Sequence, residues 1–255
     1  MITKDQIYSL AKKNKINETV IFREYLQLLF LNEFYSQSQS KNVFFKGGTA
    51  LHLIYKSPRF SEDLDFTVQI NEKEFLKFIQ KFLSELSKKE NIAFKEKRSV
   101  AGKKFLLTIK SPGLPYQAFI NLDFSFREKV LEPQKSIIET GFPIIFTSYV
   151  YHLSKEEIFA EKIRALLTRA KGRDLYDLWF LLNQGVYFKK DLVRKKLKYY
   201  HLEKITKEEI LERIKRCSKK NFILDVRPFV SLNQRSKLEE FFNYLQDYLE
   251  KNLNF

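Results

Sequence analysis

The first predicted elements come from apolar residues that repeat with helical spacing. In residues 18–35 this spacing gives a broad buried face, which predicts a helix. The apolar positions there are Ile21, Phe22, Tyr25, Leu28 and Leu29. Asn71, followed three residues later by Glu74, marks the start of another helix. Its apolar face consists of Phe75, Leu76, Ile79, Phe82, Leu83 and Leu86.

Short apolar or alternating segments, separated by glycine and proline, predict strands across the first 150 residues. The predicted strands are residues 42–45, 63–68, 92–97, 104–110, 116–126 and 143–148. Between the first two, the adjacent Gly47 and Gly48 lead into a predicted short helix at 50–56.

Helical patterns dominate the rest of the chain. Ser154 and Glu157 form a capping-box pattern that opens a helix reaching about Arg169. Further helices are predicted at 174–183, 189–200, 206–219 and 234–252. We therefore expect an α+β protein: a core with a mixed sheet and N-terminal helices over residues 1–150, and a helical domain over residues 151–255.

Composition excludes several classes of protein. One Cys and three isolated His residues argue against a disulfide framework and against a zinc site built from these residues. No apolar stretch approaches the length that spans a bilayer, and the N-terminus lacks the apolar run of a signal peptide. We therefore expect a cytoplasmic protein that does not use a membrane.

The strongest motif is the segment GGTALHLIYKSPRFSEDLDF, which ends in two aspartates on one predicted strand. Residues i and i+2 of a strand point to the same face, so Asp63 and Asp65 project together. Two such carboxylates can hold one or two Mg²⁺ ions that bind a triphosphate. Gly47 and Gly48 let backbone N–H groups approach an anion, and Thr49 adds a hydroxyl donor. The alternative is a tight turn beside an exposed acidic strand edge.

Asp123 is a candidate third carboxylate. In the segment FINLDFSF, Ile120 and Leu122 fall on one strand face. Asn121 and Asp123 fall on the other. Beside Asp65, Asp123 would complete a metal-binding trio and accept the proton of an attacking hydroxyl. The alternative is an ordinary solvent-facing strand residue.

Two predicted helices carry a second set of charged residues. Lys162 and Arg169 lie on one stripe of the helix that begins near Ser154. Asp174 and Asp177 are three residues apart, and so are neighbours on the next helix. Lys162 could bind phosphate oxygens, while the aspartates could hold Lys162 or a nucleotide. The alternative is a solvated pair of helices with routine ion pairs, and the spacing does not decide which aspartate faces a site.

Positive charge is concentrated near the C-terminus. The chain carries 46 basic and 31 acidic residues, a net charge of +15. Thirteen basic and five acidic residues lie between Lys189 and Lys220, with tyrosines nearby. Basic helices with aromatic side chains suit the phosphate backbone and unpaired bases of RNA. The alternative is a lysine-rich surface without a nucleic-acid partner.

The segment GGTALHLIYKSPRFSEDLDF and the later EKIRALLTRAKGRDLYDLWFLL resemble the motifs of the AbiEii/AbiGii family of nucleotidyltransferase toxins, which includes the MenT toxins. The resemblance implies a polymerase-β-like nucleotidyltransferase core, a helical C-terminal domain, an NTP–Mg²⁺ substrate and a cognate antitoxin. It implies triphosphate contacts for Gly47, Gly48 and Thr49, metal ligation by Asp63 and Asp65, and phosphate binding by Lys162, with Arg169 of the same block among the nucleotide-binding residues.

The remaining site residues follow from the same motifs. Asp177 would be the last active-site acid, with Asp174 beside it in the same block. Arg59 and Ser61 would bind phosphates or order the loop. The function that the resemblance implies is transfer of a nucleotidyl group from NTP to an RNA acceptor, and its likeness to the MenT group makes the tRNA 3′ end the expected acceptor. The alternatives are a phosphotransferase acting on a protein or small molecule, and a non-catalytic RNA-binding module.

Overall fold

The computed structural model describes residues 2–99, 101–110, 114–169, 171–202, 204 and 206–253. The chain divides into two compact units. The sheet unit comprises Met1–Lys56 and Phe60–Leu153, and the helical unit comprises Ser57–Arg59 and Ser154–Phe255. The division at residues 153 and 154 lies three residues beyond the expected boundary at 150. The structure also assigns the short segment Ser57–Arg59 to the helical unit, which no sequence pattern indicated.

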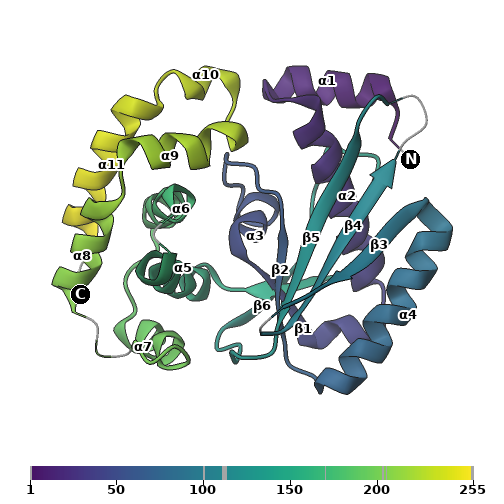
Figure 1. Ribbon diagram of the computed structural model, residues 1–255, viewed down its shortest axis with the longest axis horizontal. Helices are drawn as coiled ribbons and strands as arrows, with labels where there is room; N and C mark the ends of the chain where they lie inside the picture. The colour runs from purple at the N-terminus through teal and green to yellow at the C-terminus, as the bar shows by residue number, and fades with distance from the viewer. Residues whose placement is uncertain are drawn as a thin grey trace. The chain divides into compact units, whose positions relative to one another are not determined.

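Within the described residues, a seven-stranded mixed sheet forms the centre of the sheet unit (Figure 1). Its strands are β1 (Val43–Lys46), β2 (Leu64–Val68), β3 (Ile92–Lys97), β4 (Lys103–Lys110), β5 (Gln117–Ser125), β6 (Pro133–Ser136) and β7 (Val150–Leu153). They lie in the order β3-β4-β5-β2-β1-β7-β6. The pairs β2–β5 and β1–β7 are parallel and the other pairs are antiparallel. The mixed sheet and the helical C-terminal half confirm the predicted α+β class.

Aromatic residues build the core on one face of this sheet. The helices of the sheet unit are α1 (Lys4–Asn14), α2 (Glu18–Tyr35), the 3₁₀ turn η1 (Ser38–Asn42), α3 (Gly47–Leu53) and α4 (Glu72–Glu90). Phe30 and Phe34 of α2 lie 6.1 and 5.8 Å, between ring centroids, from Phe66 of β2. Phe66 in turn stacks on Phe124 of β5 at 4.9 Å. Because side chains alternate along a strand, the residues next to Phe66 and Phe124 point to the opposite face.

The helical unit is built around α5. Its elements are α5 (Lys155–Arg169), α6 (Gly172–Asn183), α7 (Lys190–Lys198), α8 (Lys207–Arg216), α9 (Lys219–Val226), the 3₁₀ turn η2 (Arg227–Phe229), α10 (Leu232–Arg235) and α11 (Leu238–Asn252). Helix α5 packs against α6 and α7, and α6 packs against α9 and α11. A fully buried ion pair joins two of these helices: the Lys196 ammonium of α7 lies 2.6 Å from Oε1 of Glu157 on α5.

The predicted strand at residues 143–148 is wrong, because that segment forms no ladder in the structure. The pairing begins two residues later, at Val150, and β6 was not predicted. The predicted helix at 18–35 and the predicted strand at 92–97 are confirmed residue for residue. In the part of the chain that the structure describes, no helix combines the length and apolar character needed to cross a bilayer.

Candidate active site

The glycine turn lies directly against the acidic strand of the sheet unit. Strand β1 ends at Lys46, and α3 begins at Gly47 with a φ of 79°. A β-carbon at Gly47 would overlap the carboxylate of Asp65 on β2. Residue 47 must therefore be glycine for two reasons: the left-handed backbone conformation and the close approach of the aspartate. The turn and the acid pair that the sequence placed eighteen residues apart are neighbours in space.

Thr49 joins the same two motifs by a hydrogen bond. Its hydroxyl donates to the backbone carbonyl of Asp63, and its side chain is buried. The sequence suggested that this hydroxyl binds a triphosphate. In the structure this hydroxyl links the first turn of α3, by a hydrogen bond, to Asp63, the residue that precedes β2.

Asp63 and Asp65 are both half-buried, and a β5 residue orients the first of them. The Asn121 side-chain nitrogen donates to Oδ1 of Asp63 at 2.8 Å. The carbonyl oxygen of the same amide accepts from the Lys97 ammonium at 2.7 Å, so both ends of Asn121 are engaged. The sequence pattern places Asn121 beside Asp123 on one strand face and assigns it no role of its own. Its alternation with buried residues was the signal that placed it on the polar face.

Four charged residues lie side by side across the polar face of the sheet. In backbone register, Lys46 of β1 pairs with Asp65, Asp65 pairs with Asp123 of β5, and Asp123 pairs with Lys104 of β4. The outer lysines are engaged: Lys104 lies 2.6 Å from Oδ2 of Asp123, and Lys46 lies 2.9 Å from Oε2 of the buried Glu128. Asp65 and Asp123 therefore lie between the two lysines in this row.

The donor chemistry of this face suits a divalent cation, though not as the expected trio. Among the described residues, no group of three or more His, Cys, Asp or Glu side chains is placed to hold a metal ion. Asp123 faces the same side as Asp65, but its carboxylate contacts Lys104. The carboxylates of Asp63 and Asp65 are hard oxygen donors of the kind that Mg²⁺ accepts together with water and phosphate oxygens.

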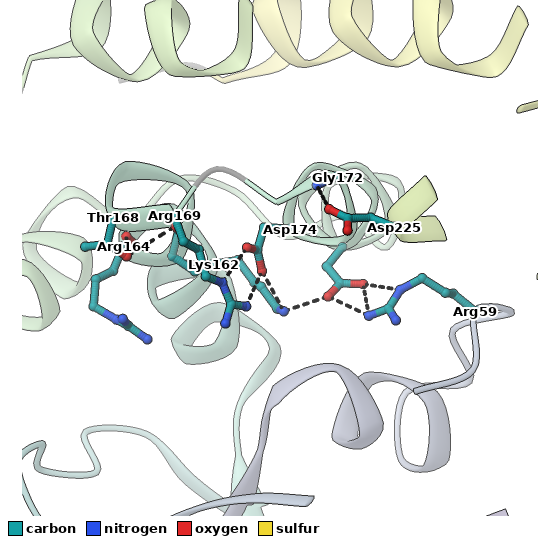
Figure 2. Close-up of polar contacts among 10 residues, drawn as sticks. Arg59, Lys162, Arg164, Thr168, Arg169, Gly172, Asp174 and Asp225 are labelled. Carbon is teal, nitrogen blue, oxygen red and sulfur yellow. Dashed lines mark hydrogen bonds and ion pairs between the residues drawn. The ribbon is translucent and has the colours of Figure 1, made fainter. Parts of the chain in front are cut away.

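The helical unit gathers the second set of predicted residues into one buried network. Lys162 of α5 lies between two carboxylates of α6, 3.2 Å from Oδ1 of Asp174 and 2.7 Å from Oδ2 of Asp177. Arg169 donates to both oxygens of Asp174 at 2.9 Å. Figure 2 shows Lys162 and Arg169 both reaching the Asp174 carboxylate. Both aspartates have no exposed surface.

Arg59 completes this network from a distant part of the sequence. Its guanidinium is 2% exposed. It donates to Asp177 through Nε at 3.0 Å and through Nη2 at 2.8 Å to each carboxylate oxygen. Arg59 was expected to bind phosphates or order the loop, and the structure places it on a protein carboxylate. Ser61 is half-buried, and its backbone carbonyl accepts from the Gln27 side chain at 3.1 Å.

The network keeps Asp174 charged in spite of its burial. Burial alone would raise the pKa of Asp174, but the Lys162 ammonium and the Arg169 guanidinium outweigh it. The pKa of Asp174 therefore lies well below its usual range. Burial also raises the pKa of the neighbouring Tyr176 to about 12, with a smaller contribution from Asp177 and an opposing one from Arg59. Arg59, Lys162 and Arg169 are thus the cations that contact these two carboxylates.

Solved structures with the same fold belong to bacterial proteins. JHP933 from Helicobacter pylori is 21% identical, with a TM-score of 0.59 over 93% of this chain and 94% of that one. MenT4, a nucleotidyltransferase toxin from Mycobacterium tuberculosis, is 19% identical, with a TM-score of 0.58 over 97% of this chain and 90% of that one. At this identity the likeness shows the fold alone. Comparison with curated protein sequences gave no match.

A match to a protein-family model defines the class as a nucleotidyltransferase. The chain belongs to the family described as nucleotidyl transferase AbiEii toxin, type IV TA system, whose model matches residues 29–247. The match covers both units and all the site residues named above. The resemblance seen in the two sequence motifs is thereby confirmed at the level of the family.

Proposed function

We propose that this toxin transfers a nucleotidyl group from an NTP to a hydroxyl of RNA, with the tRNA 3′ end as the acceptor, in a reaction that depends on Mg²⁺. One observation carries the proposal. The glycine turn packs on the Asp65 carboxylate while Thr49 binds the Asp63 backbone, so the two motifs form a single site in the sheet unit. A turn rich in backbone N–H groups beside two carboxylates can receive a triphosphate together with its metal.

Each residue of the sheet unit has a distinct role in this proposal. Asp63 and Asp65 hold the cation, and the N–H groups of Gly47 and Gly48 bind the triphosphate. Bound Mg²⁺ would neutralise charge on the phosphates as pyrophosphate leaves. Asn121 fixes the orientation of the Asp63 carboxylate by its 2.8 Å hydrogen bond. Asp123 is the candidate proton acceptor, in competition with its 2.6 Å contact to Lys104.

Lys162 and Arg169 are the candidate phosphate-binding cations of the helical unit. Lys162 is nearly buried between two aspartates, whereas half of the Arg169 side chain is exposed. The exposed part of the Arg169 side chain is the part that can meet a phosphate from solvent. Replacing Lys162 with Ala should raise the KM for NTP as well as weaken the fold, so Arg169→Gln is the cleaner variant for binding measurements.

RNA as the acceptor follows from the charge of the protein. The net charge of +15 favours a polyanion, and Lys190, Arg194, Lys195 and Lys198 are all exposed on α7. The type IV toxin–antitoxin family implies an antitoxin partner. We include such a partner in the proposal without assigning a surface to it.

Label transfer tests the proposal directly. Purified protein is incubated with tRNA, Mg²⁺ and each NTP labelled at the α-phosphate. We expect labelled tRNA from the wild type, and a loss on the order of 100-fold or more in Asp63→Asn and Asp65→Asn. Glu62→Gln, which removes a carboxylate from the adjacent residue, serves as the matched control and should keep full activity. Chelation of Mg²⁺ should abolish transfer, and its return should restore it.

Other outcomes would identify the alternatives. Transfer of the γ-phosphate instead of the α-phosphate, to a protein or small molecule, would show a phosphotransferase. RNA binding that falls with salt but is unchanged in Asp63→Asn, with no labelled product, would show a binding module. Equal α-label incorporation by the wild type and by Asp63→Asn would contradict the assigned site.

A further inference from the structure

The contacts of Asp177 distinguish it from an acid that binds a metal or a substrate. A carboxylate offers about four lone-pair positions. Asp177 makes four contacts with cations: three with Arg59 and one, at 2.7 Å, with Lys162. The side chain has no exposed surface. If the Asp177 carboxylate bound a metal ion, at least one of these buried cations would lose its contact with that carboxylate.

Asp174 is equally buried, but its partners come from a different part of the chain. Its partners, Lys162 and Arg169, both belong to α5, so Asp174 connects α6 to α5. Asp177 shares Lys162 and in addition holds Arg59, which lies 118 residues earlier in the chain. Of these two aspartates, Asp177 is the one that the structure connects to the segment Ser57–Arg59.

That segment lies in the loop between α3 and β2, and so between the glycine turn and the acid pair. The loop has a left-handed residue, Lys56, with a φ of 63°. Arg59 follows three residues later, and Asp63 is only four residues beyond Arg59. Four residues of extended chain span at most about 14 Å. An anchor at Arg59 therefore restricts the conformations open to the loop that leads into Asp63.

We infer that Asp177 is a positioning residue: it acts through Arg59, which it holds in a buried bidentate ion pair, and thereby orders the loop that ends in Asp63 and Asp65. The inference rests on the proposed function for its effect on transfer, but the ordering of the loop is independent of it. Burying an arginine is costly unless its charge is paired, so removal of the Asp177 carboxylate weakens the anchoring of Arg59 at this position. Asp174 has no such effect because no contact joins it to the loop.

Hydrogen exchange tests the ordering without any assay of activity. Amide exchange of residues 54–63 is followed in the full chain for the wild type, Asp177→Asn, Arg59→Gln and Asp174→Asn. We expect exchange at least 10-fold faster in Asp177→Asn and Arg59→Gln than in Asp174→Asn, which leaves the pair of Arg59 with Asp177 in place. Equal effects of Asp174→Asn and Asp177→Asn on this segment would overturn the inference. If Asp177→Asn does not fold, Arg59→Lys is used, which keeps the charge but removes the bidentate geometry.

A double-mutant cycle tests how Asp177 acts on transfer. If Asp177 works only through Arg59, the double variant Arg59→Gln/Asp177→Asn has the same kcat/KM as Arg59→Gln alone. A further decrease in the double variant would show that Asp177 acts by a second route, through Lys162 or directly on the substrate, and would overturn the inference. The Mg²⁺ concentration at half-maximal rate gives a second readout. It should be unchanged in Asp177→Asn and raised in Asp65→Asn, since only the latter removes a proposed ligand. A raised value in Asp177→Asn would mark it as a ligand and also overturn the inference.

Failure of the proposed function has a different signature. A wild-type protein that transfers no nucleotide under any condition would contradict the nucleotidyl-transfer proposal, while the exchange experiment would still decide the role of Asp177.

Discussion

Gly47 and Asp65 lie in direct contact, so closely that a single methyl group on the glycine would overlap the aspartate carboxylate. Gly47→Ala should therefore disturb both the backbone of the turn and the position of the Asp65 carboxylate. The left-handed φ of 79° costs a non-glycine residue about 1 kcal/mol or more, and the methyl group must displace the carboxylate proposed to bind Mg²⁺. We expect kcat/KM for nucleotidyl transfer to fall at least 10-fold, with a higher Mg²⁺ requirement.

The matched control for this substitution is Gly141→Ala. Nothing lies within 4 Å of a β-carbon at Gly141, and its φ is not in the left-handed region. Transfer by this variant should equal that of the wild type. Wild-type activity and Mg²⁺ dependence in Gly47→Ala would show that the turn does not position Asp65.

Gly172, the first residue of α6, makes a comparable contact inside the helical unit. A β-carbon there would lie 2.5 Å from the Cα of Phe222 on α9, and its N–H donates to Asp225 at 2.8 Å. Because the clash is with backbone, Gly172→Ala should separate the two helices. We expect the free energy of unfolding to fall by about 1–3 kcal/mol.

Tryptophan fluorescence can measure this change selectively. Trp179, the single tryptophan of the chain, lies on α6 and so reports on the helical unit. A denaturant midpoint that falls in Gly172→Ala, but not in Gly141→Ala, supports the close contact of α6 with α9. An unchanged midpoint in both variants would contradict it.

Local patterns predicted most elements because periodicity and capping are local properties. Asn71 caps α4 in the structure, where its side chain accepts from the Lys73 N–H at 2.9 Å. The failure at 143–148 has a physical reason. Exposure alternates there as in a strand, and Ile145 is 83% exposed. Yet no other described segment of the protein forms a ladder with residues 143–148. Alternation predicts extended backbone, whereas a ladder also requires a partner, which the sequence does not reveal.

Part of the site could also be predicted, because its sequence signals are local. The two-residue spacing of Asp63 and Asp65 and the glycine pair are local signals, and both indicated the polar face of the sheet. The pairing of Arg59 with Asp177 joins residues 118 positions apart, and no periodicity encodes such a contact. The contact between Lys104 and Asp123 could not be predicted either, because it depends on the register between β4 and β5.

Asp174 should make the stability of the helical unit sensitive to acid. Its pKa is lowered in the folded protein, whereas an unfolded aspartate titrates near about 3.9. As pH falls below about 5, the unfolded chain binds a proton that the folded chain does not, so the free energy of unfolding decreases. At pH 7 the charged form is paired in full, and Asp174→Asn should cost about 3–5 kcal/mol.

Unfolding followed by Trp179 fluorescence between pH 7 and pH 3 checks this expectation. The stability difference between the wild type and Asp174→Asn should shrink as the pH falls through 4. The exposed Asp247→Asn, with the same change in charge, should stay within about 0.5 kcal/mol of the wild type throughout. A difference for Asp174→Asn that does not vary with pH would contradict a lowered pKa.

The exposed stripe of α7 should contribute to RNA binding if RNA is the acceptor. Lys190, Arg194 and Lys198 are exposed and four residues apart, which places them on one face of the helix. Replacing all three with Glu should weaken tRNA binding. The slope of log Kd against log salt should fall by about 0.7 for each phosphate that the protein no longer neutralises, so by roughly 2 in total. Binding is measured by fluorescence anisotropy of labelled tRNA over a series of salt concentrations.

Helix α4 offers a control with the same geometry. Lys73, Lys77 and Lys81 are also exposed and four residues apart, and their replacement with Glu removes the same net charge. If α7 contacts RNA, affinity and slope decrease in the α7 variant only. If both variants weaken equally, total charge rather than a surface of α7 attracts RNA. The distinction matters physically, because long-range attraction falls off within about 10 Å at 0.1 M salt, whereas direct phosphate contacts release counterions and set the slope.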